Sequence, residues 1–106
     1  MKSLRNPQRK PTHPGAVLRE DVLPELGWTQ IELANRLMVS RQTVSHLLHE
    51  QKAVTAEMAI RIASIVGGTP ESWLNMQQAV DLWEATIKFK SNPTLTPLLQ
   101  NMALGD

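Results

Sequence analysis

The chain has 106 residues, which favours one small domain. It lacks cysteine, so disulfide bonds and thiolate metal sites are excluded, and this agrees with the reducing cytoplasm in which we expect the protein to work. The formal net charge of +1 excludes a histone-like polycation, and no apolar run approaches the roughly 20 residues of a membrane span.

The beginning of the chain is basic. Between Met1 and Arg19 it carries five basic residues and no acidic residue. Residues 1–12 include two prolines and almost no apolar side chains, so we expect a flexible arm there. Such an arm either follows a DNA backbone, touches a partner protein, or is a tail without a partner.

The first expected helix begins after His13, because Pro14 suits the first helical position. We expect His13 to order this helix start rather than to act in catalysis. The apolar stripe of the helix consists of Val17, Leu18 and Val22. Pro24 is expected to end the helix near Val22, and Trp28 then covers the core after a turn at 25–27.

Residues 29–37 and 40–49 are expected to form two short helices joined by a tight turn. Thr29 is a suitable N-cap, and Glu32 lies where it can return a hydrogen bond to the cap residue. Ser40 caps the second helix so soon after the first that no loop fits between them. The expected apolar faces are Ile31, Leu33, Ala34 and Leu37 in the first helix, and Val44, Leu47 and Leu48 in the second.

The outer face of the second helix is rich in hydrogen-bond donors. Arg41 can donate two hydrogen bonds to guanine, and Gln42 can pair with adenine as donor and acceptor. We expect this helix to enter a DNA major groove, although the same residues also occur on ordinary solvated surfaces. The expected base contacts are Arg41, Gln42, Ser45 and His46. The expected phosphate contacts are Gln30, Ser40, Thr43 and Lys52.

Thr55 is expected to cap a further helix that runs to about Val66, where Gly67-Gly68 stops it. Its expected buried face consists of Ala59, Ile62, Ala63 and Val66, with Met58 and Ile65 at the margins.

The last expected helix spans residues 70–90, with Thr69 as its cap. It carries two apolar stripes, so two surfaces should cover it. One stripe is assigned to a dimer interface and consists of Trp73, Met76, Val80, Trp83 and Ile87. The opposite stripe consists of Leu74, Leu82, Ala85 and Phe89. The alternative to a second subunit is that the C-terminal tail, residues 91–106, folds back over the helix.

Catalytic and metal sites are not expected. His46 and His49 are three residues apart on a helix, but no third ligand lies near them in the sequence. No phosphate-binding loop or nucleophile motif is present. We therefore expect neither an enzyme nor a cofactor, and no membrane partner.

Several of these motifs resemble one family. Thr29-Gln30-x-Glu32-Leu33-Ala34 with Ser40-Arg41-Gln42-Thr43-Val44-Ser45 is similar to the helix-turn-helix of phage repressors, the Xre-type family. His13-Pro14-Gly15 before it, and Pro70-Glu71-x-Trp73-Leu74-Asn75 with Asp81-Leu82-Trp83 after it, resemble the HigA-type (VapI-type) antitoxins. The likeness covers about residues 13–90.

The sequence departs from this family at two turns. Met38 lies between the two short helices where the family usually has glycine, and this substitution costs roughly 1 kcal/mol. His49-Glu50-Gln51 replaces the usual Asn-Gly turn. A carboxylate at Glu50 would oppose a nearby phosphate, whereas Lys52 can compensate.

The resemblance implies an all-α, five-helix bundle of the lambda-repressor-like helix-turn-helix type with an extended C-terminal helix. Residues 13–90 would form one DNA-binding domain that includes a dimerisation helix at 70–90. One small domain makes too few contacts for specific repression, so we expect a homodimer that binds palindromic operator DNA. By the same resemblance, the protein would repress its own operon and neutralise a HigB-like mRNA-cleaving toxin as a type II antitoxin. The alternatives are a stand-alone Xre-type repressor without a toxin, and a protein-binding adaptor that has lost DNA binding.

Overall fold

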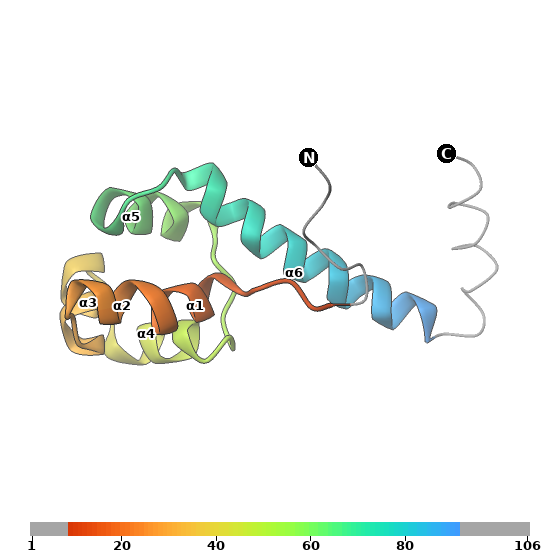
Figure 1. Ribbon diagram of the computed structural model, residues 1–106, viewed down its shortest axis with the longest axis horizontal. Coiled ribbons are helices and arrows are strands. Elements are labelled where there is room, and N and C mark those ends of the chain that lie inside the picture. The colour runs from red at the N-terminus through yellow and green to blue at the C-terminus, as the bar shows by residue number, and fades with distance from the viewer. Residues whose placement is uncertain (1–8, 92–106) are drawn as a thin grey trace.

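The computed structural model describes residues 9–91, and all regular structure in that part of the chain is helical. The elements are α1 (Pro14–Val17), a π-helical turn η1 (Leu18–Val22), α2 (Leu23–Leu26), α3 (Gln30–Leu37), α4 (Arg41–Leu48), α5 (Ala56–Val66) and α6 (Pro70–Lys90). The first three follow one another without a break and form one rod (Figure 1). The described part therefore has the five helical units and the all-α fold that the sequence predicted.

The first rod is longer than predicted, because Pro24 does not end it. Proline lacks an N–H, and in a regular α-helix its ring would collide with the carbonyl group four residues earlier. The wider turn of η1 lies just before Pro24, and there the Leu23 N–H donates to the Leu18 carbonyl five residues back. The helix then continues to Leu26 and ends at Gly27, whose φ of 70° is left-handed.

The predicted N-caps are present. The Thr29 hydroxyl accepts from the Glu32 N–H at 3.1 Å, and the Glu32 carboxylate accepts from the Thr29 N–H at 2.9 Å. The same capping role is filled by Ser40, Thr55 and Thr69. Each cap satisfies N–H groups that the first turn of a helix leaves without a partner.

The core lies where the rod, α3, α4, α5 and the first half of α6 meet. Its fully buried side chains include Leu18, Leu33, Leu37, Val44, Leu47, Leu48 and Ile62. Ile31 was predicted to share this core but is 49% exposed, so that prediction is wrong. Trp28 packs against the core as predicted, and the Arg36 guanidinium lies over its ring at 4.2 Å.

The long helix α6 leaves the bundle halfway along its length (Figure 1). Trp73 and Val80, assigned to a dimer interface from the sequence, are 6% and 1% exposed within the single chain. The prediction is wrong for these two residues because α5 and the rest of the bundle already cover them. Met76 also packs against the core, whereas Trp83 is partly exposed and Ile87 is 49% exposed.

The chain reaches the rod by running beside α6. The Lys10 ammonium lies 3.7 Å from the Glu84 carboxylate, and Pro11 lines a small hollow with Trp83 and Ile87. The predicted flexible arm at 1–12 and tail at 91–106 lie mostly outside the described residues. Among the described residues, no helix is long and apolar enough to cross a membrane.

Candidate nucleic-acid interface

Helices α3 and α4 pack together across a very short connection. Met38 ends α3 with a φ of 61°, the left-handed conformation predicted for the glycine position of this turn. Ser40 then caps α4 through a 3.0 Å hydrogen bond from the Thr43 N–H to its hydroxyl. The turn packs α4 against α3, and Val44, Leu47 and Leu48 of α4 are buried.

The outer face of α4 is uncovered within the described chain. Arg41 and Gln42, in its first turn, are exposed, and so is His46 one turn later. Ser45 and Thr43 are partly exposed. None of these side chains lies beneath other described parts of the protein, so the face is accessible to a DNA groove.

A groove of about 680 Å³ separates the beginnings of α3 and α4. Its lining residues are Thr29, Gln30, Ile31, Arg41, Gln42 and Ser45. Four of the residues predicted from the sequence to contact DNA therefore line one concave surface. Thr29 and Ile31 also line it, although neither was assigned to the interface from the sequence.

The other predicted contacts lie outside this groove. The Ser40 hydroxyl accepts from the Thr43 N–H and donates to the Thr43 hydroxyl at 2.9 Å, so both side chains also serve the helix cap. Lys52 is exposed beyond the end of α4, where it lines a separate hollow near α6. The Nδ1 atom of His49 lies 2.8 Å from the Ser45 carbonyl oxygen, a contact within its own helix end.

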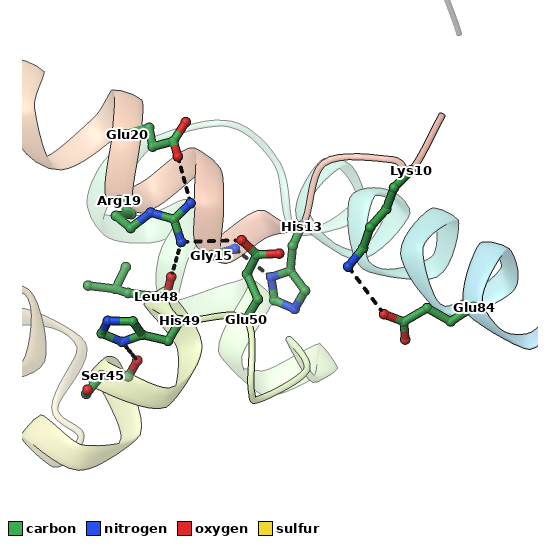
Figure 2. Close-up of polar contacts among 10 residues, drawn as sticks. All are labelled: Lys10, His13, Gly15, Arg19, Glu20, Ser45, Leu48, His49, Glu50 and Glu84. Atoms are coloured by element: carbon green, nitrogen blue, oxygen red, sulfur yellow. Dashed lines mark hydrogen bonds and ion pairs between the residues drawn. The ribbon is translucent and has the colours of Figure 1, made fainter. Parts of the chain in front are cut away.

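His13 holds the first turn of the rod beside the end of α4, as Figure 2 shows. Its Nδ1 accepts a 2.9 Å hydrogen bond from the Gly15 N–H, which confirms the predicted ordering role. Burial lowers the pKa of His13 and favours the neutral ring that this acceptor role requires, although Glu50 opposes the shift. A Cβ atom on Gly15 would lie 1.8 Å from the Leu47 carbonyl oxygen, so only glycine fits.

Sequence reasoning missed Arg19, which ties the rod to the end of α4. Its guanidinium donates to the Leu48 carbonyl at 2.6 Å and contacts the carboxylates of Glu50 and Glu20 (Figure 2). The hydrogen bond to Glu20 raises the pKa of Arg19, burial partly opposes this shift, and the hydrogen bond to Glu50 adds to it. Leu48 and Glu50 lie about thirty residues away in the chain, so no local sequence pattern signals the contact.

The short capped helix pair, its tight turn and its exposed polar face define a helix-turn-helix protein of Xre type. The helix-turn-helix family model matches residues 18–74, more than half of the chain.

Similar proteins from bacteria indicate which helix-turn-helix proteins this chain resembles. The chain is 39% identical over 87 residues to antitoxin HigA-1 of Vibrio cholerae, with 82% of each chain covered. It is 41% identical over 76 residues to an uncharacterised HTH-type transcriptional regulator of Haemophilus influenzae, with 72% of this chain and 71% of the relative covered.

Solved structures agree with these relatives. Antitoxin HigA of Pseudomonas aeruginosa with the higBA promoter matches at a TM-score of 0.73 and 33% identity, covering 77% of this chain and 89% of that one. Antitoxin GraA in complex with its operator matches at 0.68 and 43% identity, covering 78% and 83%. The chain belongs to the HigA-type antitoxins, the family that its motifs resemble. This family consists of regulators rather than enzymes, in agreement with the expectation drawn from the sequence.

Proposed function

We propose that this protein is the antitoxin of a type II toxin–antitoxin module and acts in the cytoplasm. In this proposal a homodimer binds palindromic operator DNA through α4, represses its own operon, and neutralises a HigB-like mRNA-cleaving toxin. The observation that carries the DNA-binding part is the exposed, donor-rich first turn of α4 beside the groove that α3 completes. Two similar structures contain promoter or operator DNA, which supports DNA binding.

The roles of the side chains follow from their positions. In our proposal Arg41, Gln42, Ser45 and His46 reach base edges from α4, while Gln30 reaches a phosphate from the beginning of α3. Ser40 and Thr43 contact phosphate from the cap of α4, and Lys52 does so from beyond its end. The overall charge is low, so specificity depends on these contacts more than on bulk attraction to DNA.

The homodimer is proposed to form through the projecting half of α6. Trp83 and Ile87 remain available there, and Leu82 is 65% exposed on the same half. Two copies related by a two-fold axis would place their α4 helices in half-sites about 34 Å apart.

The toxin-binding part of the proposal rests on membership of the HigA-type antitoxins, since several relatives carry that name. The candidate surfaces for toxin binding are the basic arm, the first rod and the second apolar stripe of α6. The test is co-purification with the product of the adjacent gene, followed by rescue of growth when both genes are expressed together. An adjacent gene product that neither binds nor is toxic would rule this part out.

DNA binding is tested by fluorescence anisotropy with a duplex that carries the promoter of the chain's own operon. Arg41→Ala and Gln42→Ala should each cost roughly 1–3 kcal/mol of binding free energy on the promoter duplex. Each variant should bind as well as the wild type to a duplex in which the base that the lost side chain contacts has been changed. Gln78→Ala removes an exposed glutamine from α6 and serves as the matched control. If the wild-type protein does not bind this promoter at low salt, the DNA-binding proposal fails.

A stand-alone repressor is the second candidate. It is favoured by the regulator of Haemophilus influenzae, which is similar over most of its length and is named only as a transcriptional regulator. It predicts promoter binding by the wild-type protein without any toxin partner. An adaptor that has lost DNA binding predicts instead that Arg41→Ala changes nothing.

A further inference from the structure

Arg19 joins three acceptors at the place where the rod crosses the end of α4. One terminal nitrogen, Nη1, donates to the Leu48 carbonyl at 2.6 Å and to the Glu50 carboxylate at 3.3 Å. The other, Nη2, donates to Glu20 at 2.7 Å. Figure 2 shows the guanidinium between these groups, with the Glu50 side chain turned back toward the rod.

Two of these acceptors, Leu48 and Glu50, lie at the end of α4 or just beyond it, whereas Glu20 lies next to Arg19 in the rod. Leu48 is the final residue of α4, so its carbonyl has no partner within the helix. Glu50 follows in the left-handed conformation, with a φ of 63°, which takes its side chain out of the helical path. Arg19 therefore satisfies the end of α4 and fixes the direction of the side chain that follows it.

Glu50 is the only acidic residue between Glu32 and Glu57. It precedes the proposed phosphate contact Lys52 by two residues, so the two Cα atoms are at most about 7 Å apart. A carboxylate and a phosphate are both negative, and they repel each other over about one Debye length, which is roughly 8 Å at physiological salt. An unpaired Glu50 carboxylate would thus act directly against the phosphate that Lys52 is proposed to hold.

We propose that Arg19 is a positioning residue for DNA binding, which withholds the Glu50 carboxylate from the phosphate backbone while it holds the end of α4. This inference rests on the proposed DNA-binding function. It assigns to the first rod a part in DNA affinity although no residue of the rod lines the groove of the proposed interface.

The experiment compares the wild-type protein with Arg19→Gln, Glu50→Gln and the double variant. The probe is a duplex selected by the wild-type protein from a random library, and a scrambled duplex of equal length measures non-specific binding. Arg19→Gln should bind the selected duplex about tenfold more weakly at roughly 0.05 M salt, and the deficit should shrink by 0.3 M because salt screens the freed carboxylate. Glu50→Gln alone should change affinity less than twofold, and the double variant should recover most of the loss.

Arg61→Gln is a matched control. Arg61 donates to the Leu37 carbonyl at the end of α3 at 2.8 Å and pairs with Glu57 at 2.8 Å. Its side chain is 35% exposed, as is that of Arg19. The substitution removes the same charge and the same kind of helix-end contact, but frees no carboxylate next to Lys52. We expect wild-type salt dependence from this variant, and circular dichroism verifies that every variant is folded at the assay temperature.

Two results would overturn the inference while leaving DNA binding intact. The first is an Arg19→Gln variant that binds like the wild type at every salt concentration. The second is a loss that Glu50→Gln fails to rescue, which would mean that Arg19 touches DNA itself or serves stability alone. A wild-type protein that selects no duplex at all would instead defeat the proposed function, so the two failures are distinguishable.

Discussion

The two halves of α6 carry similar apolar spacing but have different surroundings. In the first half, Trp73, Gln77 and Val80 are buried, and the Trp73 Nε1 donates to the Gly67 carbonyl at 2.9 Å. In the second half, from Asp81 to Lys90, every residue is at least partly exposed. The apolar stripe is continuous along the helix, but only the half that lies against α5 and the rod is covered by its own chain.

Amphipathic spacing therefore identifies which residues share a face of a helix, but it does not identify the neighbour that covers them. The first half of α6 is part of the folding core, so changes there should lower stability. The second half offers surface, so changes there should affect association and leave stability nearly unchanged.

The largest expected difference separates two tryptophans on this one helix. Trp73→Ala should lower the free energy of unfolding by about 3–5 kcal/mol, because it empties a packed site. Trp83→Ala should lower it by only about 1 kcal/mol, since a partly exposed ring loses less buried apolar area. Urea unfolding at low protein concentration measures both, and equal losses would contradict the division of α6 into two halves.

Association should respond in the opposite way. Trp83→Glu should weaken the proposed homodimer by about 2 kcal/mol or more, because it introduces a charge into the apolar centre of the interface. Light scattering over a range of protein concentrations follows the change in mass. Ile60→Glu is the control, since Ile60 is 58% exposed on α5. If Trp83→Glu leaves the mass unchanged, α6 is not the interface.

The first half of α6 also buries one polar side chain, that of Gln77. The buried Gln77 side-chain oxygen accepts from the Val54 N–H at 2.9 Å, and its nitrogen donates to Asp81 at 2.9 Å. Gln77→Ala should cost about 1–3 kcal/mol of unfolding free energy, because it leaves a buried N–H without an acceptor. The neighbouring Gln78→Ala should change it by less than about 0.5 kcal/mol. Thermal unfolding of both variants decides whether the buried hydrogen bond matters.

The smallest expected effect is a pH dependence of stability caused by His13, which lies near the middle of α6. Burial lowers the pKa of His13, while Glu50, Glu84 and Asp81 partly oppose this shift and Lys10 adds to it. Because the folded state favours the neutral ring, its stabilising contribution is complete above the usual pKa of about 6.5 and is lost as the pH falls through the lower pKa of the folded state.

His13→Asn supplies the control for this pH dependence, since asparagine can cap the helix but does not titrate. The melting temperature of the wild-type protein should therefore fall between pH 7 and pH 5 by more than that of the variant. Parallel curves for the two proteins would show that His13 does not contribute.

Local features of this fold were predictable from the sequence, whereas long-range ones were not. The caps at Thr29, Ser40, Thr55 and Thr69 depend on residues three positions apart, so the sequence contains both partners. The exposed first turn of α4 also follows from its own polar residues. The same logic failed for Ile31, because its place on an apolar spacing does not reveal whether a neighbouring helix extends far enough to cover it.

The long-range contacts could not be predicted from the sequence. Arg19 reaches Leu48 and Glu50 across about thirty residues, and Gln77 reaches Val54 across 23. Arg19 and Glu20 look like an ordinary charged pair on a solvated helix face, and only the packing of the rod against α4 gives Arg19 its partners. From the sequence, Glu50 was expected to oppose DNA binding. That expectation could not take into account the ion pair with Arg19, which turns the Glu50 side chain toward the rod.

The π-helical turn of the first rod has a consequence for tolerance to changes in chain length. Leu18 and Leu23 are both buried although they are five residues apart, because η1 contains one residue more than a regular α-helical turn. Deletion of the exposed Asp21 would convert this stretch to ordinary α-helix, in which the Pro24 ring would collide with the carbonyl group four residues earlier. The number of residues between Leu18 and Pro24 is therefore constrained from two sides, and we expect insertions or deletions of one residue in this stretch to be poorly tolerated.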